Sequence, residues 1–454
     1  MTSEQTQAPE RDTAKRRVPR RRLPHRGRPE PLPGIRRWLR VLGPGLITGA
    51  ADDDPSGIGT YSQAGAAFGM GLLWLALYLL PLVIAVQEMC GRIGLVCGKG
   101  IAGVIRRHYS RKVLFGAVSL LFIANTINVG ADLGAMAASV QLLAPGLPFR
   151  WLLVGFAFST LLLEIFIPYR YYARVLKVLT LSLLAYVITG IIVQPDWLAL
   201  LRDTVLPQIS FTPAYLALVI AVIGTTISPY LFFWQASEEV EETELRHPHM
   251  KDDPSLRSHV RRWIRALRVD TAWGLFAASA TFWFIVVTTG VTLHSHGNIR
   301  NITTAAQAAQ ALQPLAGDFA GVFFALGIIG TGLLAVPVLA GSAAYGIAEA
   351  FGWREGLGET LNHARGFYTV IAASTLVGLG LNFLGIDPIA ALVYTAVING
   401  IVAVPLLILI LLAANNRTIM GDFHNRWLSN VLGILTTLLV TAAGVALLVT
   451  LVHP

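Results

Sequence analysis

The chain has 454 residues, of which 54% are hydrophobic and only 13% are charged, whereas an ordinary soluble domain is about a quarter charged. Its mean hydropathy is +0.61, and apolar runs of about 20 residues, long enough to cross a bilayer, recur along the whole chain. These properties exclude an ordinary soluble domain and predict an all-α polytopic membrane protein with the lipid bilayer as its main partner.

The net charge of +9 is concentrated near the N-terminus, where a dozen Arg and Lys residues precede Val41. Gathered in a tail, these charges indicate membrane topology and not a nucleic-acid-binding face. Residues 1–40 are rich in Arg and Pro and almost free of apolar side chains, which predicts a disordered basic cytoplasmic tail. Because further apolar spans follow the first one, we expect no signal peptide.

Apolar windows predict about eleven transmembrane spans. If the tail is cytoplasmic, the loops on its side of the membrane are all rich in Arg or Lys, and the opposite loops carry very few, as the positive-inside rule expects. The sequence therefore predicts a multi-pass protein of the cell membrane with a cytoplasmic N-terminus. The spans are expected at residues 41–64, 72–97, 113–140, 151–168, 172–194, 213–237, 268–293, 317–348, 366–384, 388–414 and 427–452.

The first and sixth spans are each interrupted by a proline beside small or hydroxyl residues, in DDDPSGIG around Pro55 and IGTTISPYLFF around Pro229. Proline breaks the helical hydrogen-bond ladder, and unwound backbone at membrane depth is tolerated only where it lines a cavity. Broken helices five spans apart indicate two inverted repeats around a substrate site, as in the LeuT-like fold.

These breaks predict the organisation of the chain after the tail. The first five-helix repeat is expected at residues 41–194 and the second, inverted repeat at 213–414. The eleventh helix and the C-terminus occupy 427–454.

Asp54 immediately precedes the first break. A carboxylate within a membrane span is costly and is a functional-site hypothesis by default. Together with carbonyls freed by the break and the negative end of the preceding half-helix, Asp54 predicts a cation site. The alternative is that Asp52, Asp53 and Asp54 cap a helix near an interface, and Asp52 or Asp53 could also serve as a vestibule charge.

The sixth span offers only oxygen donors before its proline: carbonyls at Thr225 and Thr226 and the hydroxyl of Ser228. Hard oxygen ligands suit Mg, Ca or Mn, whereas softer metals favour sulfur and imidazole. The alternative for these hydroxyl residues is hydrogen bonding back to their own helix.

Other polar residues lie within predicted spans. Asp132 of the third span could relay protons, attract cations or be a hydrogen-bonded structural residue, and Asn399 of the tenth could add one more oxygen. Asp53 belongs to the same possible pathway. Gln87 and Glu88, near the end of the second span, fit a functional or a structural role equally well.

Three further groups do not require a special function. Cys90 and Cys97 read as small apolar residues of one helix and imply no disulfide. The acidic run EEVEETE from Glu238 is expected to be a solvated charge run, although it could concentrate cations. The histidines expected in loops, and not in a metal site, are His247, His249, His294 and His296.

Several segments resemble the NRAMP metal-ion transporters. GPGLITGAADDDPSGIGTY looks like the first-span signature of that family, in which GPG leads to an Asp-Pro-Gly-Asn motif. QEMCGRIGLVCGKG resembles the end of its second span, ADLGAM its third, and NNRTIMGDF the loop after its tenth. The order and spacing of these segments make the resemblance specific over nearly the whole chain after the tail.

The sequence departs from the family pattern at the residues that would bind the ion. Gly57 occupies the place of the motif's Asn ligand, and Ser228 and Tyr230 replace the Met and His of the sixth-span Met-Pro-His. In the third span Asp132 is kept, but the nearby family Glu is replaced by Ala135. These substitutions resemble the NRAMP-related magnesium transporters, a branch that carries Mg²⁺ and Mn²⁺ without evident proton coupling.

The resemblance implies a divalent metal-ion importer that works by alternating access and is not an enzyme. Asp54 would be the main charged ligand, Thr225 would complete the site, and Ser228 and Gly57 would make room for a partly hydrated Mg²⁺ or Mn²⁺. No cofactor and no obligate protein partner are expected.

Three alternatives stay open at this stage. One is a proton-coupled Mn²⁺ or Fe²⁺ importer of the ordinary NRAMP type. Another is a sodium-coupled solute carrier of the same fold, although Asp54 would repel a substrate carboxylate. The last is an intramembrane aspartyl protease, for which Asp54 and Asp132 are the only plausible pair, although neither lies in a Gly-x-Gly-Asp setting.

Overall fold

The computed structural model describes residues 44–167, 180–246 and 257–452, and every regular element among them is helical. Nine of these helices are long and apolar enough to cross a membrane, and a bent pair of helices makes a tenth candidate. The all-α membrane architecture is therefore confirmed. The predicted tail at 1–40 and the histidines His247 and His249 lie outside the described residues.

Both predicted helix breaks are present. The first span consists of α2 (Pro44–Asp52) and α3 (Pro55–Phe68), and the sixth of α11 (Pro213–Thr226) and α12 (Pro229–Arg246). Each proline is the first residue of its second half-helix, where its missing N–H group costs no hydrogen bond. The first span, with halves of 9 and 14 residues and three aspartates at the break, is not among the nine.

The remaining spans lie close to the predicted ranges. The fifth includes α9 (Leu184–Ile192), which α10 (Trp197–Val205) follows at an angle of 117°. The others are α4 (Trp74–Cys97), α6 (Arg111–Leu143), α7 (Phe149–Phe166), α13 (Arg257–Thr289), α16 (Ala320–Phe351), α17 (Arg365–Leu381), α18 (Pro388–Asn415) and α20 (Trp427–Val452).

The seventh span and the connections differ from the prediction. Helix α13 begins at Arg257 and not at residue 268, because its first turns are charged and an apolar window does not detect them. Short helices also occupy connections that the sequence left unassigned: α5 (Ile101–His108), α14 (Ala305–Ala309), α15 (Gln313–Ala316) and α19 (Arg417–Met420), together with a π-helix, η4 (Gly290–His296), that continues α13.

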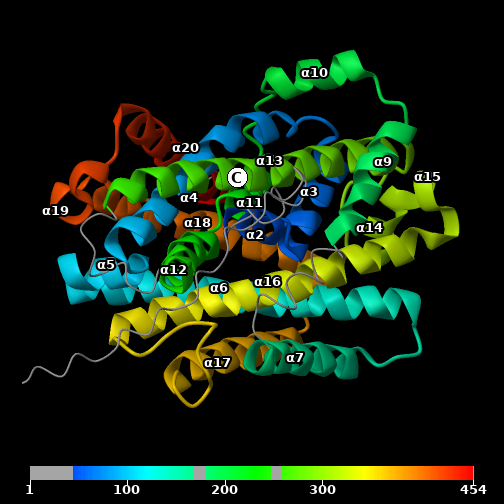
Figure 1. Ribbon diagram of the computed structural model, residues 1–454. Coiled ribbons are helices and arrows are strands. Elements are labelled where there is room, and N and C mark those ends of the chain that lie inside the picture. Colours follow the sequence, from blue (N-terminus) through cyan, green and yellow to red (C-terminus); the bar gives the residue numbers. More distant parts are fainter. Residues whose placement is uncertain (1–43, 168–179, 247–256, 453–454) are drawn as a thin grey trace, which may run out of the picture. The chain divides into compact units, whose positions relative to one another are not determined.

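Close helix packing in the bundle depends on small residues. Helices α6 and α16 run side by side (Figure 1), and α2 lies so close to α13 that a Cβ atom on Gly49 would be 2.3 Å from the carbonyl carbon of Gly274. Helix α11 touches α18 in the same way, at Gly224 and Gly400. Such contacts let helices associate where lipid removes the hydrophobic driving force.

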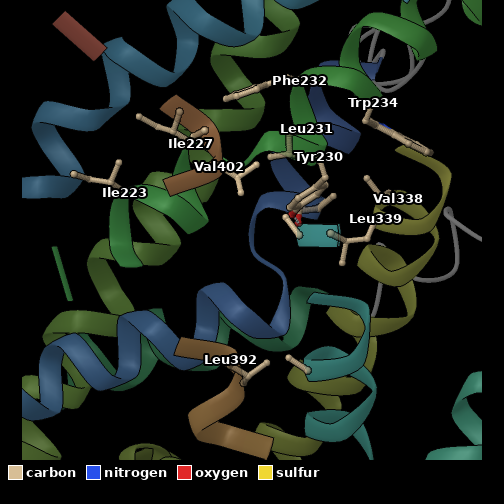
Figure 2. Packing of buried hydrophobic residues seen from close by; sticks show 14 of the residues in the cluster. Ile223, Ile227, Tyr230, Leu231, Phe232, Trp234, Val338, Leu339, Leu392 and Val402 are labelled. Carbon is tan, nitrogen blue, oxygen red and sulfur yellow. Dashed lines mark hydrogen bonds between the residues drawn. The ribbon is translucent and has the colours of Figure 1, made fainter. Parts of the chain in front are cut away.

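Large apolar side chains fill the space on either side of the second break. Figure 2 shows Tyr230 and Trp234 of α12 with Val338 and Leu339 of α16 beside them. All four side chains are fully buried. This packing fixes the position of α12 and therefore of the residues at the break. The repeat boundaries at 41–194 and 213–414 stay predictions.

Candidate metal-ion site

Asp54 lies at the first break, where its carboxylate is buried and held by four donors. One oxygen, Oδ1, accepts from the Ser56 hydroxyl at 2.6 Å and from the Gly57 N–H group at 2.7 Å. The other, Oδ2, accepts from Asn128 Nδ2 at 3.1 Å and from the Tyr230 hydroxyl at 3.3 Å. Asp54 is thus the N-cap of α3, but it caps that helix within the bundle and is only 1% exposed.

The second break brings oxygen atoms to the same place. Thr225 Oγ1 lies 3.3 Å from the Ser56 hydroxyl, so the two breaks meet through these side chains. The Ser228 hydroxyl donates to the carbonyls of Gly224 at 2.9 Å and of Thr225 at 2.6 Å. This is the hydrogen bonding back to its own helix that the sequence left as the alternative for Ser228, and it occupies the Thr225 carbonyl.

Gly57 lies directly between the two breaks. A Cβ atom there would be 3.2 Å from the Asp52 carbonyl oxygen, 3.3 Å from the Tyr61 ring and 3.4 Å from Thr225 Oγ1. In this arrangement the glycine makes room for its neighbours and not for a water molecule. The hydrated cavity that the sequence suggested stays a prediction for the ion-loaded protein.

Further buried oxygens at the first break and on α6 have no hydrogen-bond donor in the described chain. Asp132 is fully buried, and neither of its carboxylate oxygens accepts a hydrogen bond of ordinary geometry. Oδ1 of Asp52, Asp53 and Asn128 also lacks a partner in the described chain. Because unpaired buried acceptors are costly, this excess of oxygens suits a cation.

Asn128 was missed by the sequence reasoning, although it donates directly to Asp54. It precedes Asp132 by four residues on α6, so the two side chains lie one turn apart on the same helix face. That spacing was the available signal. Ser56 and Tyr230 also bond Asp54, and Tyr230 further donates to the Ala51 carbonyl at 2.7 Å, which joins α12 to the end of α2.

The other predicted pathway residues are less closely connected to Asp54. Asp53 is 6% exposed and adjoins Thr281 of α13. Asn399 of α18 is buried, with its Nδ2 unpaired, and no described contact joins it to Asp54. The next residue, Gly400, contacts Gly224, which immediately precedes Thr225 in α11. Asn399 therefore lies near the second break.

The half-helix α2 is held against the bundle on the far side of the break from α3. The Gly45 N–H group donates to Asp270 Oδ2 of α13 at 2.7 Å, and Thr48 Oγ1 lies 2.5 Å from Gln235 Oε1 of α12. Asp270 thereby caps a helix that belongs to another span. With α2 in place, Asp54, Thr225 and Ser228 are all at most 1% exposed, and these ligand candidates are closed to solvent.

Comparison with known proteins decides the family. The family model described as natural resistance-associated macrophage protein-like, Nramp, matches residues 45–450. The chain belongs to the Nramp family. It is therefore a multi-pass membrane protein that transports divalent metal cations, in agreement with the resemblance seen in the first three spans.

Curated relatives cover nearly the full length of this Nramp transporter. The divalent metal cation transporter MntH of Deinococcus radiodurans is 26% identical over 424 residues, which is 90% of this chain and 89% of that protein. MntH of Klebsiella pneumoniae subsp. pneumoniae is also 26% identical, over 411 residues, 89% of this chain and 93% of the relative.

Solved structures show the fold. A manganese transporter from Eremococcus coleocola superposes with a TM-score of 0.71 and 19% identity, covering 91% of this chain and 88% of that one. Mhp1, a nucleobase-cation-symport-1 family transporter, superposes with a TM-score of 0.52 and 13% identity, covering 90% and 93%. The Nramp chain thus has the LeuT-like fold of inverted repeats with broken first and sixth helices.

The acidic run of this transporter is not simply a solvated charge run. Residues 238–244 continue α12, and within them Glu239 is 7% exposed and accepts from Gln235 at 3.1 Å. Glu241 accepts from the Tyr345 hydroxyl and from the Leu357 N–H group at 2.9 Å. The expectation of full solvation was wrong for these two residues, because α12 packs against α16 and the chain after it.

Of the other residues that the sequence singled out, Glu88 and His294 have structural partners, whereas Gln87 has none in the described chain. Glu88 forms ion pairs with Arg92 at 3.2 Å and Arg268 at 2.9 Å. His294 Nδ1 lies 2.8 Å from the Ala66 carbonyl. Cys90 is buried and Cys97 half-buried, both as free thiols. Gln87 is fully buried, and neither end of its amide has a partner in the described chain.

Proposed function

We propose that this transporter moves Mg²⁺, Mn²⁺ or both across the cytoplasmic membrane by alternating access, with Asp54 as the main charged ligand. Thr225 and Ser228 supply further oxygens, and Gly57 shapes the site beside them. The proposal is carried by one observation: the carboxylate of Asp54 lies buried between two helix breaks, amid an excess of unpaired oxygen acceptors.

The oxygen-only surroundings favour a hard ion. Ser228 stands where the family pattern has a thioether, and loss of sulfur removes a ligand that prefers softer metals. Among the described residues, no three His, Cys, Asp or Glu side chains are placed to hold one metal. A site with few protein ligands suits Mg²⁺, which gives up its waters reluctantly and is usually held through one or two carboxylates.

The same substitutions support transport without proton coupling as part of the proposal. Tyr230 and Ala135 stand where the family pattern has a histidine and a glutamate, and neither a phenol nor a methyl group takes up or releases a proton near neutral pH. Asp132 is the one remaining carboxylate of the third span, and we propose that it attracts the cation to the site. Asp53 and Asn399 would lie along the same pathway.

Alternating access would use the half-helices. Movement of α2 away from α13 would break the contact between Gly45 and Asp270 and open the site on one side, while the packing of α3 stays in place. We propose that this side is cytoplasmic. The basic tail leads into α2, the Arg-rich loops connect other spans on the same side of the membrane, and basic loops are typical of the cytoplasmic side. Residues 41–194 and 213–414 would be the two inverted repeats, with α2 in the first of them.

The test is uptake of Mg²⁺ and Mn²⁺ into proteoliposomes with an internal pH dye. We expect uptake of both ions by the parent without acidification, and loss of uptake in Asp54→Ala. Ser139→Ala is the matched control, because that buried hydroxyl bonds only within its own helix, to the Ala135 carbonyl. Unchanged divalent uptake in Asp54→Ala would refute the assigned ligand.

Proton-coupled manganese import is the second candidate. The curated relatives are named divalent metal cation transporters, and the Eremococcus coleocola structure is named a manganese transporter. Mn²⁺ uptake with acidification and no Mg²⁺ uptake would establish it in place of our proposal. A sodium-coupled solute carrier would share only its fold with this chain, as Mhp1 does. Membership of a metal-transporter family argues against that function. It also argues against a protease built on Asp54 and Asp132.

A further inference from the structure

A basic pocket lies away from the ion site, where α4 ends and α13 and α20 begin. Its volume is about 210 Å³, and we call it the arginine pocket after the five arginines that line it. They are Arg92, Arg261, Arg265, Arg268 and Arg426. None of these residues belongs to the proposed ion site.

The floor of the arginine pocket is rigid. Arg92 is only 3% exposed, and its guanidinium donates to Glu88 at 3.2 Å, to Asn425 Oδ1 at 2.5 Å and to the Phe423 carbonyl. Asn425 in turn donates through its backbone to the Ala414 carbonyl at 2.9 Å. Arg92 therefore pins the chain between α19 and α20, which forms one wall of the pocket.

The opposite wall is one face of α13. Arg261, Arg265 and Arg268 follow one another at spacings of four and three residues, which places them on the same side of a helix. Between them Ile264 is buried against Leu95 of α4. This apolar contact determines which side of α13 packs against α4, and the three arginines lie at the edge of the contact.

Positive charge in the pocket exceeds negative charge. Glu88 is shared by Arg92 and Arg268, and Asp422 is the one acidic residue in the described lining. Five guanidinium groups thus face two carboxylates, an excess of three positive charges. Arg261, Arg265 and Arg426 are exposed, and none of the described residues forms an ion pair with them.

The arginine pocket lies at the membrane surface. It lies where three apolar spans end, at Cys97, Val260 and Trp427, and hence at the level of the membrane surface. Trp427 is 77% and Leu428 58% exposed, directly after Arg426. Tryptophan is typical of this interface, and these two side chains offer an apolar surface beside the basic pocket.

We propose that the arginine pocket binds the phosphate group of an anionic lipid headgroup, whose acyl chains lie along Trp427 and Leu428. The planar guanidinium fork matches phosphate geometry, and basic pockets between spans are suited to anionic headgroups. A free phosphate would satisfy the same charges, but it would make no use of the neighbouring apolar surface.

Native mass spectrometry of the full-length detergent-purified protein tests this proposal, with phosphatidylglycerol, phosphatidylcholine and inorganic phosphate as separate probes. The test variant carries Arg261→Gln, Arg265→Gln and Arg426→Gln. The matched control carries Arg111→Gln, Lys112→Gln and Arg262→Gln, which removes the same charge from exposed residues outside the pocket.

We expect retention of phosphatidylglycerol over phosphatidylcholine, and an apparent affinity that falls about fivefold for each pocket arginine removed. The control should bind like the parent. If the triple variant does not purify as a folded protein, Arg265→Gln and Arg426→Gln are measured singly, and each should show its own fivefold loss.

Two results would overturn the proposal. One is equal phosphatidylglycerol retention by the parent and the pocket variants; the other is an equal loss in the control, since either would make the binding a general effect of net charge. Displacement of the lipid by inorganic phosphate would overturn the lipid assignment. The pocket would then be a phosphate site for a soluble ligand.

Discussion

Asn128 Nδ2 donates to Asp54 Oδ2 across 3.1 Å and so joins the middle of α6 to the break in the first span. Both side chains are buried, at 0% and 1% exposed. The amide leaves its own oxygen, Oδ1, without a partner. Asn128 therefore orients the carboxylate and holds a further oxygen beside it.

Replacing Asn128 by leucine should weaken ion transport. Leu has a similar volume but no donor, and a buried hydrogen bond to a charged group contributes about 1.5–3 kcal/mol. We expect the transport efficiency of Asn128→Leu for Mg²⁺ to fall at least about tenfold, measured as uptake into proteoliposomes over a range of concentrations. Equal efficiency in Asn128→Leu and the parent would remove Asn128 from the site.

Ser228 should control the choice between metals. Ser228→Met introduces a thioether 1 residue before Pro229, and sulfur favours Mn²⁺ over Mg²⁺. We expect the ratio of Mn²⁺ to Mg²⁺ uptake to rise by about tenfold, the equivalent of 1.4 kcal/mol. Ser228→Leu is the control for added volume, and the same ratio in both variants would show that size and not sulfur caused the change.

The close contact between α2 and α13 should tolerate no side chain. A Cβ atom at Gly49 would meet the Gly274 backbone at 2.3 Å, and overpacking of this kind costs about 1–3 kcal/mol. Gly49→Ala should therefore lower the melting temperature in detergent and alter uptake. Gly116→Ala is the control, because no atom lies within 4 Å of a Cβ there; a comparable melting temperature for both variants would contradict the packing argument.

The helix breaks could be predicted from sequence because proline coincides there with polar and small neighbours. Proline alone was not sufficient: Pro81, Pro337 and Pro405 lie inside the continuous helices α4, α16 and α18. Pro337 and Pro405 follow Val and precede apolar residues, whereas Pro55 follows three aspartates. The surrounding chemistry therefore separates a break from a tolerated proline, since a broken span needs groups that line a cavity.

Contacts between distant spans could not be predicted in the same way. The bond between Asn128 and Asp54 joins positions 74 residues apart, and the one between Asp270 and Gly45 joins positions 225 apart. No local pattern encodes such pairs. The charged start of α13 was also missed, because hydropathy detects the part of a helix that meets lipid and not the part that continues beyond it.

Glu355, in the connection between α16 and α17, provides a test by pH. It lines a cavity of about 600 Å³, where burial, and then repulsion from Glu349 and Glu241, raise its pKa from 4.5 to about 9, with Lys99 opposing and Glu244 adding to the shift. The folded protein therefore keeps this proton between pH 4.5 and 9, whereas the unfolded chain releases it. Its contribution to stability is complete below the lower value and is lost as the pH rises toward the higher one.

Glu355→Gln removes this pH dependence while keeping the shape of the protonated side chain. Wild type and variant should melt at similar temperatures near about pH 5, and the variant should be the more stable near about pH 8, with a difference that grows by at most about 1.4 kcal/mol per pH unit. Melting of the detergent-purified proteins across this range checks it. A variant that is less stable than wild type at the higher pH would mean that the ionised carboxylate is the form that the cavity stabilises, with Lys99 outweighing the burial and the neighbouring glutamates.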